Sequence, residues 1–83
     1  MWYVYIVRCG DGSLYTGIAL DPQERLRSHN AGRGSAYVRS QGCAVLLYRE
    51  VCRTKIMALQ REFEIKSWRR KKKLELIASQ TQR

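Results

Sequence analysis

Apolar and polar side chains alternate in two short segments near the start of the chain. Residues 2–9 (WYVYIVRC) and 14–18 (LYTGI) are rich in aromatic and β-branched side chains, which favour extended strands. Between them, residues 10–13 read Gly-Asp-Gly-Ser, which is typical of a tight turn. The pattern therefore predicts a β-hairpin.

The register of this hairpin follows from the two faces of its strands, because a shift of one residue moves every side chain to the opposite face. One mostly apolar set belongs together on one face: Trp2, Val4, Ile6, Leu14 and Ile18. The other face then carries Tyr3, Tyr5, Tyr15 and Gly17. This register requires an odd-length connection, such as a three-residue loop with a glycine in the left-handed region. Two tyrosines ten residues apart, Tyr5 and Tyr15, are thus expected to converge on one surface.

A helix and a third strand are expected next. Asp21 is a good N-cap, Pro22 suits the first helical position, and Glu24 completes a capping-box-like pattern. Glycines after residue 30 predict that the helix ends near Asn30. Residues 43–51 then form an apolar segment that predicts the third strand.

Two more helices are expected in the last third of the chain. Thr54 can cap a helix that runs to about Trp68, and a basic helix should begin at about residue 69 and extend through Ile77. The predicted order β-β-α-β-α-α indicates a single α+β domain over residues 1–83, with a small and mainly antiparallel sheet.

The second helix places a carboxylate in an apolar arc. On a helical wheel the arc contains Ile56, Ala58, Leu59, Phe63 and Ile65. The opposite, polar side contains Gln60, Arg61, Glu64 and Ser67. Glu62 falls inside the apolar arc, where a charge needs a cation or hydrogen-bond donor beside it. Glu62 is therefore either a half-exposed glutamate paired with Arg or Lys, or part of a functional site.

The net charge points to a polyanionic partner. Sixteen Lys and Arg against seven Asp and Glu give +9, with a pI near 10.0. Residues 35–83 hold twelve of the bases and only four of the acids. This one-sided charge favours nucleic acid first and an anionic membrane surface second, although it is also compatible with a surface that is simply basic.

Several classes of protein are excluded or disfavoured. The longest apolar run, residues 44–48, is far shorter than the roughly 20 residues that span a bilayer, and no secretory signal is visible. We therefore expect a soluble, cytoplasmic protein. Three cysteines without zinc-ligand spacing and a single histidine argue against structural zinc and favour buried, reduced thiols.

The motifs resemble those of a known family. Tyr3-Val4-Tyr5, Tyr15-Thr16-Gly17, Arg25, His29 and Glu62 occur in the order and at the spacings of the GIY-YIG nuclease superfamily. The sequence is most similar to the small stand-alone YhbQ-like branch, over nearly the whole of residues 2–77. The resemblance implies a three-stranded sheet flanked by helices, and a phosphodiesterase site that uses one Mg²⁺ or Mn²⁺ ion.

The resemblance also implies roles for individual residues. The catalytic residues that it places in this chain are Tyr5, Tyr15, Gly17, Arg25, His29 and Glu62. Glu62 is the implied metal ligand, and Arg25, four residues from His29 on one helical face, would grip the phosphate. Tyr15 or His29 would accept the proton of the attacking water. Gly17, without a side chain, would let the phosphate approach the sheet.

Two departures from the family pattern bear on these roles. Tyr3 replaces the glycine of the first motif, as is common in the small branch. Ile18 stands where excision-repair nucleases carry a lysine, which favours His29 over Tyr15 as the base. Larger relatives take specificity from appended domains, so a partner protein could supply it here.

The expected partner is nucleic acid rather than a membrane, with DNA favoured over RNA and DNA repair or processing as the setting. The side chains expected to contact phosphates are Arg33, Arg39, Lys66, Arg69, Arg70, Lys71, Lys72 and Lys73. Two alternatives stay open. One is a non-catalytic nucleic-acid-binding module, and the other is a basic amphipathic helix over residues 68–77 that binds membranes or an acidic partner, although its apolar face is narrow.

Overall fold

The computed structural model describes residues 1–30 and 45–81, which form three strands and three helices. Their bounds are β1 (Trp2–Arg8), β2 (Leu14–Ala19), α1 (Pro22–Asn30), β3 (Val45–Cys52), α3 (Lys55–Lys66) and α4 (Arg70–Thr81). This order confirms the predicted α+β class. Helix α3 ends two residues before the predicted Trp68. Cys43, predicted to begin the third strand, lies outside the described residues.

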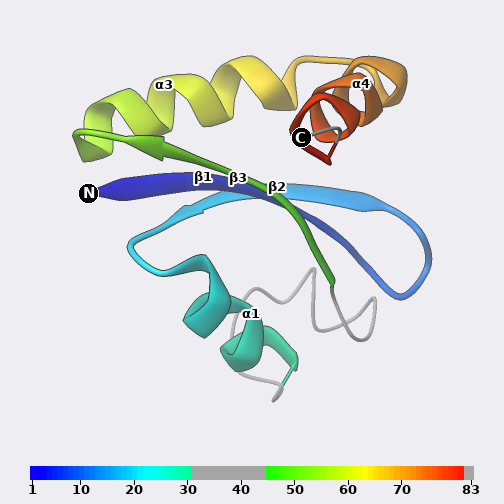
Figure 1. Ribbon diagram of the computed structural model, residues 1–83, viewed down its shortest axis with the longest axis horizontal. Coiled ribbons are helices and arrows are strands. Elements are labelled where there is room, and N and C mark those ends of the chain that lie inside the picture. Colours follow the sequence, from blue (N-terminus) through cyan, green and yellow to red (C-terminus); the bar gives the residue numbers. More distant parts are fainter. Residues whose placement is uncertain (31–44, 82–83) are drawn as a thin grey trace.

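The sheet separates two helical layers. Its strand order is β2-β1-β3, and both neighbouring pairs are antiparallel. Helices α3 and α4 cover one face and α1 covers the other (Figure 1). Because β1 is central, its side chains contribute to a core on each face: Val4 and Ile6 on the side of α3, and Tyr5 and Val7 on the side of α1. In the part of the chain that the structure describes, no helix is both long and apolar enough to cross a membrane.

The hairpin has the predicted register. Val4 lies opposite Ile18 and Tyr5 lies opposite Gly17, which places the tyrosines and Gly17 on the face covered by α1. The loop closes with the Cys9 backbone N–H donating to the Ser13 carbonyl oxygen at 2.8 Å. Three residues remain between them, and Gly12 has a φ of 88°, the left-handed conformation that the register requires.

Two predicted helix caps are also present. The Asp21 carboxylate accepts hydrogen bonds from the backbone N–H groups of Gln23 and Glu24, at 3.1 and 3.2 Å. Thr54 accepts one from the N–H of Met57 at 3.1 Å. These side chains satisfy backbone donors that have no partner inside the first turn of a helix, so they define where α1 and α3 begin.

A β-bulge between β1 and β3 changes the face of β3. Ile6 lies opposite Tyr48, but the next residue, Val7, lies opposite Leu46. One extra residue is therefore inserted on β3 at this point. As a result, Tyr48 packs with Val4 and Ile6 in the core beneath α3, whereas Leu46 packs in the core on the other face of the sheet.

Helix α3 is rotated away from the predicted apolar arc. Ala58 and Ile65 are fully buried, as predicted. Three other members of the arc are exposed instead: Ile56 at 67%, Leu59 at 43% and Phe63 at 78%. Arg61, predicted to face solvent, has a side chain only 27% exposed. The prediction was wrong because Arg61 pairs with Glu50 on β3, and a wheel of hydrophobicity alone does not represent such a partner.

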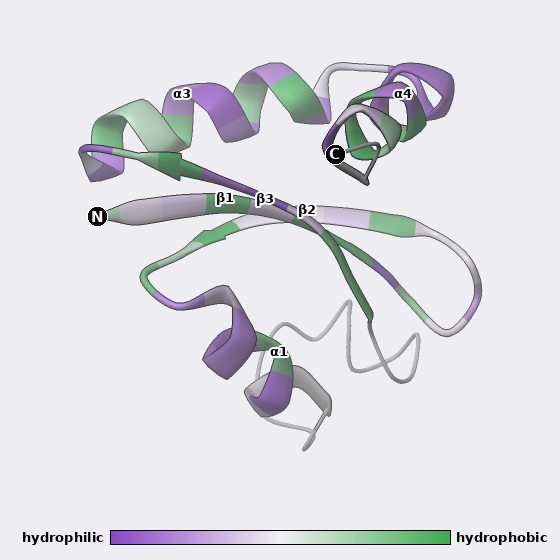
Figure 2. Ribbon diagram, viewed as in Figure 1, coloured by the Kyte–Doolittle hydropathy of each residue, from purple (hydrophilic) through white to green (hydrophobic). Residues whose placement is uncertain are grey.

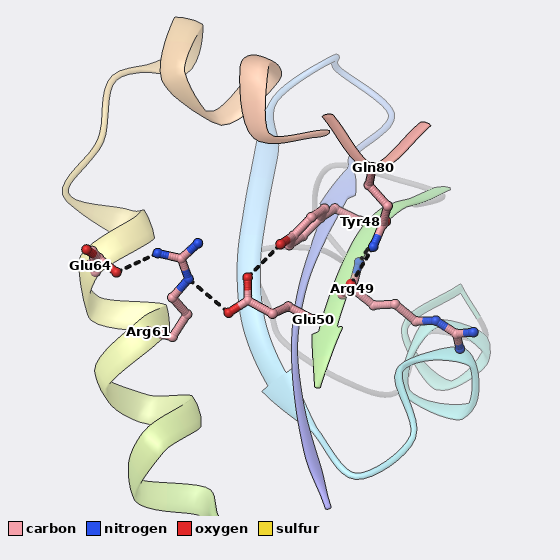
Figure 3. Close-up of polar contacts among 6 residues, drawn as sticks. All are labelled: Tyr48, Arg49, Glu50, Arg61, Glu64 and Gln80. Atoms are coloured by element: carbon pink, nitrogen blue, oxygen red, sulfur yellow. Dashed lines mark hydrogen bonds and ion pairs between the residues drawn. The ribbon is translucent and has the colours of Figure 1, made fainter. Parts of the chain in front are cut away.

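A polar network ties α3 to β3 (Figure 3). Glu50 lies between Tyr48 and Arg61: it accepts a hydrogen bond from the Tyr48 hydroxyl at 2.6 Å and one from Arg61 Nε at 2.9 Å. Arg61 Nη1 also donates to Glu64 at 2.6 Å. Burial and the hydrogen bond to Glu50 raise the pKa of Tyr48 to about 12, so its hydroxyl remains a donor at neutral pH.

Helix α4 is held against the free edge of β3. The Gln80 side-chain amide donates to the Arg49 carbonyl oxygen at 2.7 Å and accepts from the Arg49 backbone N–H at 3.4 Å. Trp68 lies in the connection between α3 and α4. The centroid of its ring is 5.3 Å from the guanidinium carbon of Arg61 and 4.3 Å from Nζ of Lys72. The two hydrogen bonds of Gln80 satisfy backbone groups of an edge strand that would otherwise face water.

Replacing Arg61 by alanine is expected to lower the free energy of unfolding by about 2 kcal/mol, because it leaves the half-buried Glu50 without its cation and removes the contact with Trp68. The matched control is Arg27→Ala, which removes an exposed pair with Glu24 and should cost less than about 0.5 kcal/mol. Urea unfolding followed by circular dichroism measures both. Equal losses for the two variants would contradict the structural role of Arg61.

Candidate active site

Tyr5, Tyr15 and Gly17 meet on the sheet face covered by α1. Tyr5 is 3% exposed, and its hydroxyl oxygen lies only 2.7 Å from the place that a Cβ atom would take at Gly17. The nearest ring carbon of Tyr15 lies 3.3 Å from the same place. The absent side chain of Gly17 is therefore what allows the Tyr5 hydroxyl to cross strand β2 beside Tyr15.

The electrostatics around Tyr5 bring two helices into the same site. Burial, the nearby Tyr15 and, to a smaller extent, Glu62 together raise the pKa of Tyr5 to about 12, and Arg25 opposes them. Tyr5 thus keeps its proton at neutral pH and can donate a hydrogen bond, but it cannot serve as a base. Groups from β2, α1 and α3 all act on one hydroxyl of β1.

Arg25 stands on α1 at the border of a surface depression. The depression has a volume of about 380 Å³ and lies where α1 meets the ends of β1 and β2. Its lining includes Trp2, Asp21, Arg25 and Ser28. The neighbouring Glu24 pairs with Arg27 rather than with Arg25. Arg25 is an exposed residue, so it is accessible to a ligand from solvent.

His29 belongs to the same helix. The backbone of α1 is described through Asn30, so His29 holds the helical position one turn after Arg25.

Glu62 lies on α3 with a side chain only 18% exposed. Its Oε2 atom lies 3.2 Å from the Nζ atom of Lys66, and that ammonium lies 5.9 Å from the centroid of the Tyr15 ring. The predicted pairing of Glu62 with a lysine is therefore present, although the side chain is mostly buried rather than half-exposed. A role of Glu62 in a functional site stays a prediction.

The donor set suits only some metals. Among the described residues no three His, Cys, Asp or Glu side chains gather as a ligand cluster. Glu62 is a single carboxylate, and Mg²⁺ or Mn²⁺ can be bound through one or two carboxylates because these ions retain several water ligands. A structural zinc site would need four protein ligands, which the described residues do not bring together. Cys9 and Cys52 are free and buried, as expected of reduced structural thiols.

The predicted phosphate-contacting residues divide into three groups. Lys66 is drawn into the site by Glu62, and Lys72 lies over the Trp68 ring. The remaining described members are Arg69, Arg70, Lys71 and Lys73, at or just before the first turn of α4. This hydrophilic stretch is visible at the start of α4 in Figure 2. Arg33 and Arg39 lie outside the described residues.

Sequence reasoning did not single out the polar network of Tyr48, Glu50 and Arg61. A signal for it existed, because Arg61 lies three residues after Ala58 and four before Ile65, the spacing of one helical face. A charged residue at that spacing between two buried ones needs a partner on the sheet, and Glu50 provides it.

Comparisons with known proteins agree with this geometry. A model of the GIY-YIG family, described as the GIY-YIG catalytic domain, matches residues 1–75. The UPF0213 protein SSP2268 of Staphylococcus saprophyticus is 50% identical over 76 residues, which cover 92% of this chain and 93% of that protein. The UPF0213 protein SAV0488 of Staphylococcus aureus is 51% identical over 75 residues, with 90% and 92% covered.

One solved structure is also similar. The solution NMR structure of the UPF0213 protein BH0048 from Bacillus halodurans matches with a TM-score of 0.60 and 38% sequence identity. The match covers 94% of this chain and 84% of that one. The order of elements and the arrangement of helices around the sheet are therefore shared with a protein of the same group.

Proposed function

The chain belongs to the GIY-YIG catalytic domain family, within the small UPF0213 (YhbQ-like) group, and on that premise we propose that it is a metal-dependent endonuclease. Its proposed substrate is nucleic acid, DNA rather than RNA, in DNA repair or processing. The observation that supports this most is that close contacts join α3 to the tyrosines: Lys66 lies 3.2 Å from Glu62 and over the ring of Tyr15. That ring and the Tyr5 hydroxyl both lie against Gly17.

Each residue of this cluster has a chemical role in the proposal. Arg25 binds two phosphate oxygens with its planar guanidinium, and the protonated Tyr5 donates a hydrogen bond to the same phosphate. Tyr15 or His29 accepts the proton of the water that attacks phosphorus. Gly17 keeps the surface beside the tyrosines open for the scissile phosphate.

Glu62 is the proposed ligand of one Mg²⁺ or Mn²⁺ ion. When bound, such an ion neutralises the charge that develops on the phosphoryl and leaving oxygens. Glu62 is carried by α3, whose rotation is maintained by the ion pair between Arg61, the residue before Glu62, and Glu50 on β3. The protein thus provides a carboxylate from α3 and an arginine from α1, and both influence Tyr5.

A second candidate function is a nucleic-acid-binding module without catalysis. The basic residues at the start of α4 favour nucleic-acid binding in either case. Glu62 favours catalysis over binding alone, because a mostly buried carboxylate is a suitable ligand for a hard divalent ion, and a module that only binds phosphates does not need one. We therefore retain catalysis as the proposal, with specificity supplied in part by a partner protein.

The decisive experiment is a cleavage assay with the purified full chain. Single-stranded, duplex and branched DNA and single-stranded RNA are incubated with Mg²⁺, Mn²⁺ or EDTA, and products are separated on denaturing gels. The proposal expects cleavage of at least one DNA substrate that stops in EDTA. Binding without turnover on every substrate with either ion would instead support the non-catalytic module.

Replacing Arg25 by alanine is expected to lower single-turnover cleavage by about 10²-fold, since it removes charge stabilisation from the phosphate. Arg25→Lys should recover only part of this loss, because an ammonium cannot bind two oxygens with a planar fork. Arg27→Ala, on the same helix and paired with Glu24, is the matched control and should cleave at the wild-type rate. Wild-type cleavage by Arg25→Ala would remove this residue from the site.

A further inference from the structure

One cation reaches from α3 into the candidate active site. Lys66 and Glu62 are four residues apart, so helix geometry places them as neighbours, with Nζ and Oε2 separated by 3.2 Å. The same ammonium lies 5.9 Å from the centroid of the Tyr15 ring. Lys66 therefore pairs with the proposed metal ligand and lies over the ring of Tyr15, one of the two candidate proton acceptors.

The exposures of the two side chains differ. Glu62 is 18% exposed and Lys66 is 51% exposed. A carboxylate that is mostly removed from water needs a cation close by, whereas the half-exposed ammonium can be rehydrated at small cost. Since the lysine stem is long and flexible, Lys66 can leave Glu62 without any movement of the helix.

From these contacts we propose that Lys66 and the divalent ion compete for Glu62. The proposal rests on the assignment of Glu62 as the metal ligand in the proposed function. Without metal, the ammonium of Lys66 neutralises the carboxylate and keeps it in place. When the ion binds, the two cations repel each other, and Lys66 is released toward Tyr15 and the phosphate of the substrate.

This competition couples metal binding to nucleic-acid binding. A phosphate that accepts the released ammonium removes it from Glu62, so substrate favours the metal-bound state. By linkage, the metal favours substrate binding by the same factor. Lys66 thus contacts the substrate only in the metal-loaded protein. In a variant without Lys66, the metal should bind Glu62 without competition from the ammonium.

The variant that tests this is Lys66→Met, which keeps an apolar stem and removes the charge. Calorimetric titration of the full chain with MnCl₂, without nucleic acid, should give binding about three- to tenfold tighter than wild type. Single-turnover cleavage of the best DNA substrate should fall about tenfold. A merely structural lysine would not produce these opposite changes, since loss of structure weakens metal binding and cleavage together.

Matched variants isolate the effect. Lys55→Met removes one positive charge from the same helix, at a lysine that lies over the Trp2 ring, and should leave both measurements within about twofold of wild type. Lys66→Arg keeps the charge and should bind Mn²⁺ with wild-type affinity. Thermal unfolding of each variant verifies that it is folded.

The possible results separate this inference from the proposed function. If Lys66→Met binds Mn²⁺ no more tightly than wild type, while Glu62→Gln loses both binding and cleavage, the competition is refuted and the nuclease assignment stands. If wild type neither binds Mn²⁺ nor cleaves DNA, both are refuted. Tighter Mn²⁺ binding with slower cleavage in Lys66→Met, and neither in Lys55→Met, supports the competition.

Discussion

Replacing Glu62 by glutamine is expected to lower metal-dependent cleavage by at least about 10³-fold and to abolish Mn²⁺ binding. Glutamine has nearly the same size as glutamate but carries no charge, so it cannot hold a hard divalent ion by itself. Among the described residues no other acidic side chains form a cluster that could replace this ligand.

The fold should tolerate this substitution. Glu62 contributes an ion pair with the half-exposed Lys66, and such pairs stabilise proteins by less than about 1 kcal/mol. Loss of cleavage can therefore be read as loss of the site if the unfolding midpoint in urea stays close to that of wild type.

Glu64→Gln is the matched control for Glu62→Gln. It removes the same charge two residues further along α3, where Glu64 is 56% exposed and paired with Arg61. We expect this control to bind Mn²⁺ and to cleave DNA like wild type. Equal cleavage by Glu62→Gln, Glu64→Gln and wild type would show that the carboxylate at position 62 holds no essential ion.

Replacing Gly17 by alanine is expected to lower cleavage by about 10²-fold, because a misplacement of about 1 Å in a catalytic group has effects of this size. A Cβ atom at this position would lie 2.7 Å from the Tyr5 hydroxyl oxygen and 2.9 Å from the ring carbon that bears it. Tyr5 is 3% exposed and packed in the core, so the hydroxyl must shift within the site rather than turn out to solvent.

Gly12, in the hairpin loop, provides a control in which stability should fall and cleavage should not. Gly12 has a φ of 88°, and no atom lies within 4 Å of a Cβ built there. Gly12→Ala should therefore lower the free energy of unfolding by about 1 kcal/mol through backbone strain and leave cleavage unchanged. Single-turnover assays and urea unfolding of both variants measure the contrast. Wild-type cleavage by Gly17→Ala would show that the close approach of Tyr5 to β2 is not required.

Much of the hairpin and of the site could be predicted from local pattern. Alternation of apolar and aromatic residues, together with the loop glycines, determines the register, because only one register buries Val4 and Ile6 with Ile18. That register also places Tyr5 beside Gly17. The caps of α1 and α3 were predictable for the same reason, since Asp21 and Thr54 act on backbone donors only two or three residues away.

Interactions between distant elements were not predictable in this way. The bulge that turns Leu46 and Tyr48 to opposite faces depends on how β3 pairs with β1, which no local pattern of β3 encodes. Likewise, a helical wheel of α3 considers hydrophobicity alone. It therefore predicts that Phe63 is buried and that Arg61 faces solvent, whereas the structure has the reverse.

The sequence by itself thus determined which residue types are available for the site and which strand face carries the tyrosines, because these depend on contacts between near neighbours. The tertiary structure decided the rotation of α3. The ion pair between Arg61 and Glu50 of β3 orients this helix so that Lys66, paired with Glu62, lies over Tyr15 while Phe63 faces water. A charge that is largely removed from water needs an opposite charge beside it, so the position of that partner sets the orientation of the helix. The partner of Arg61 lies eleven residues away in the sequence, on β3.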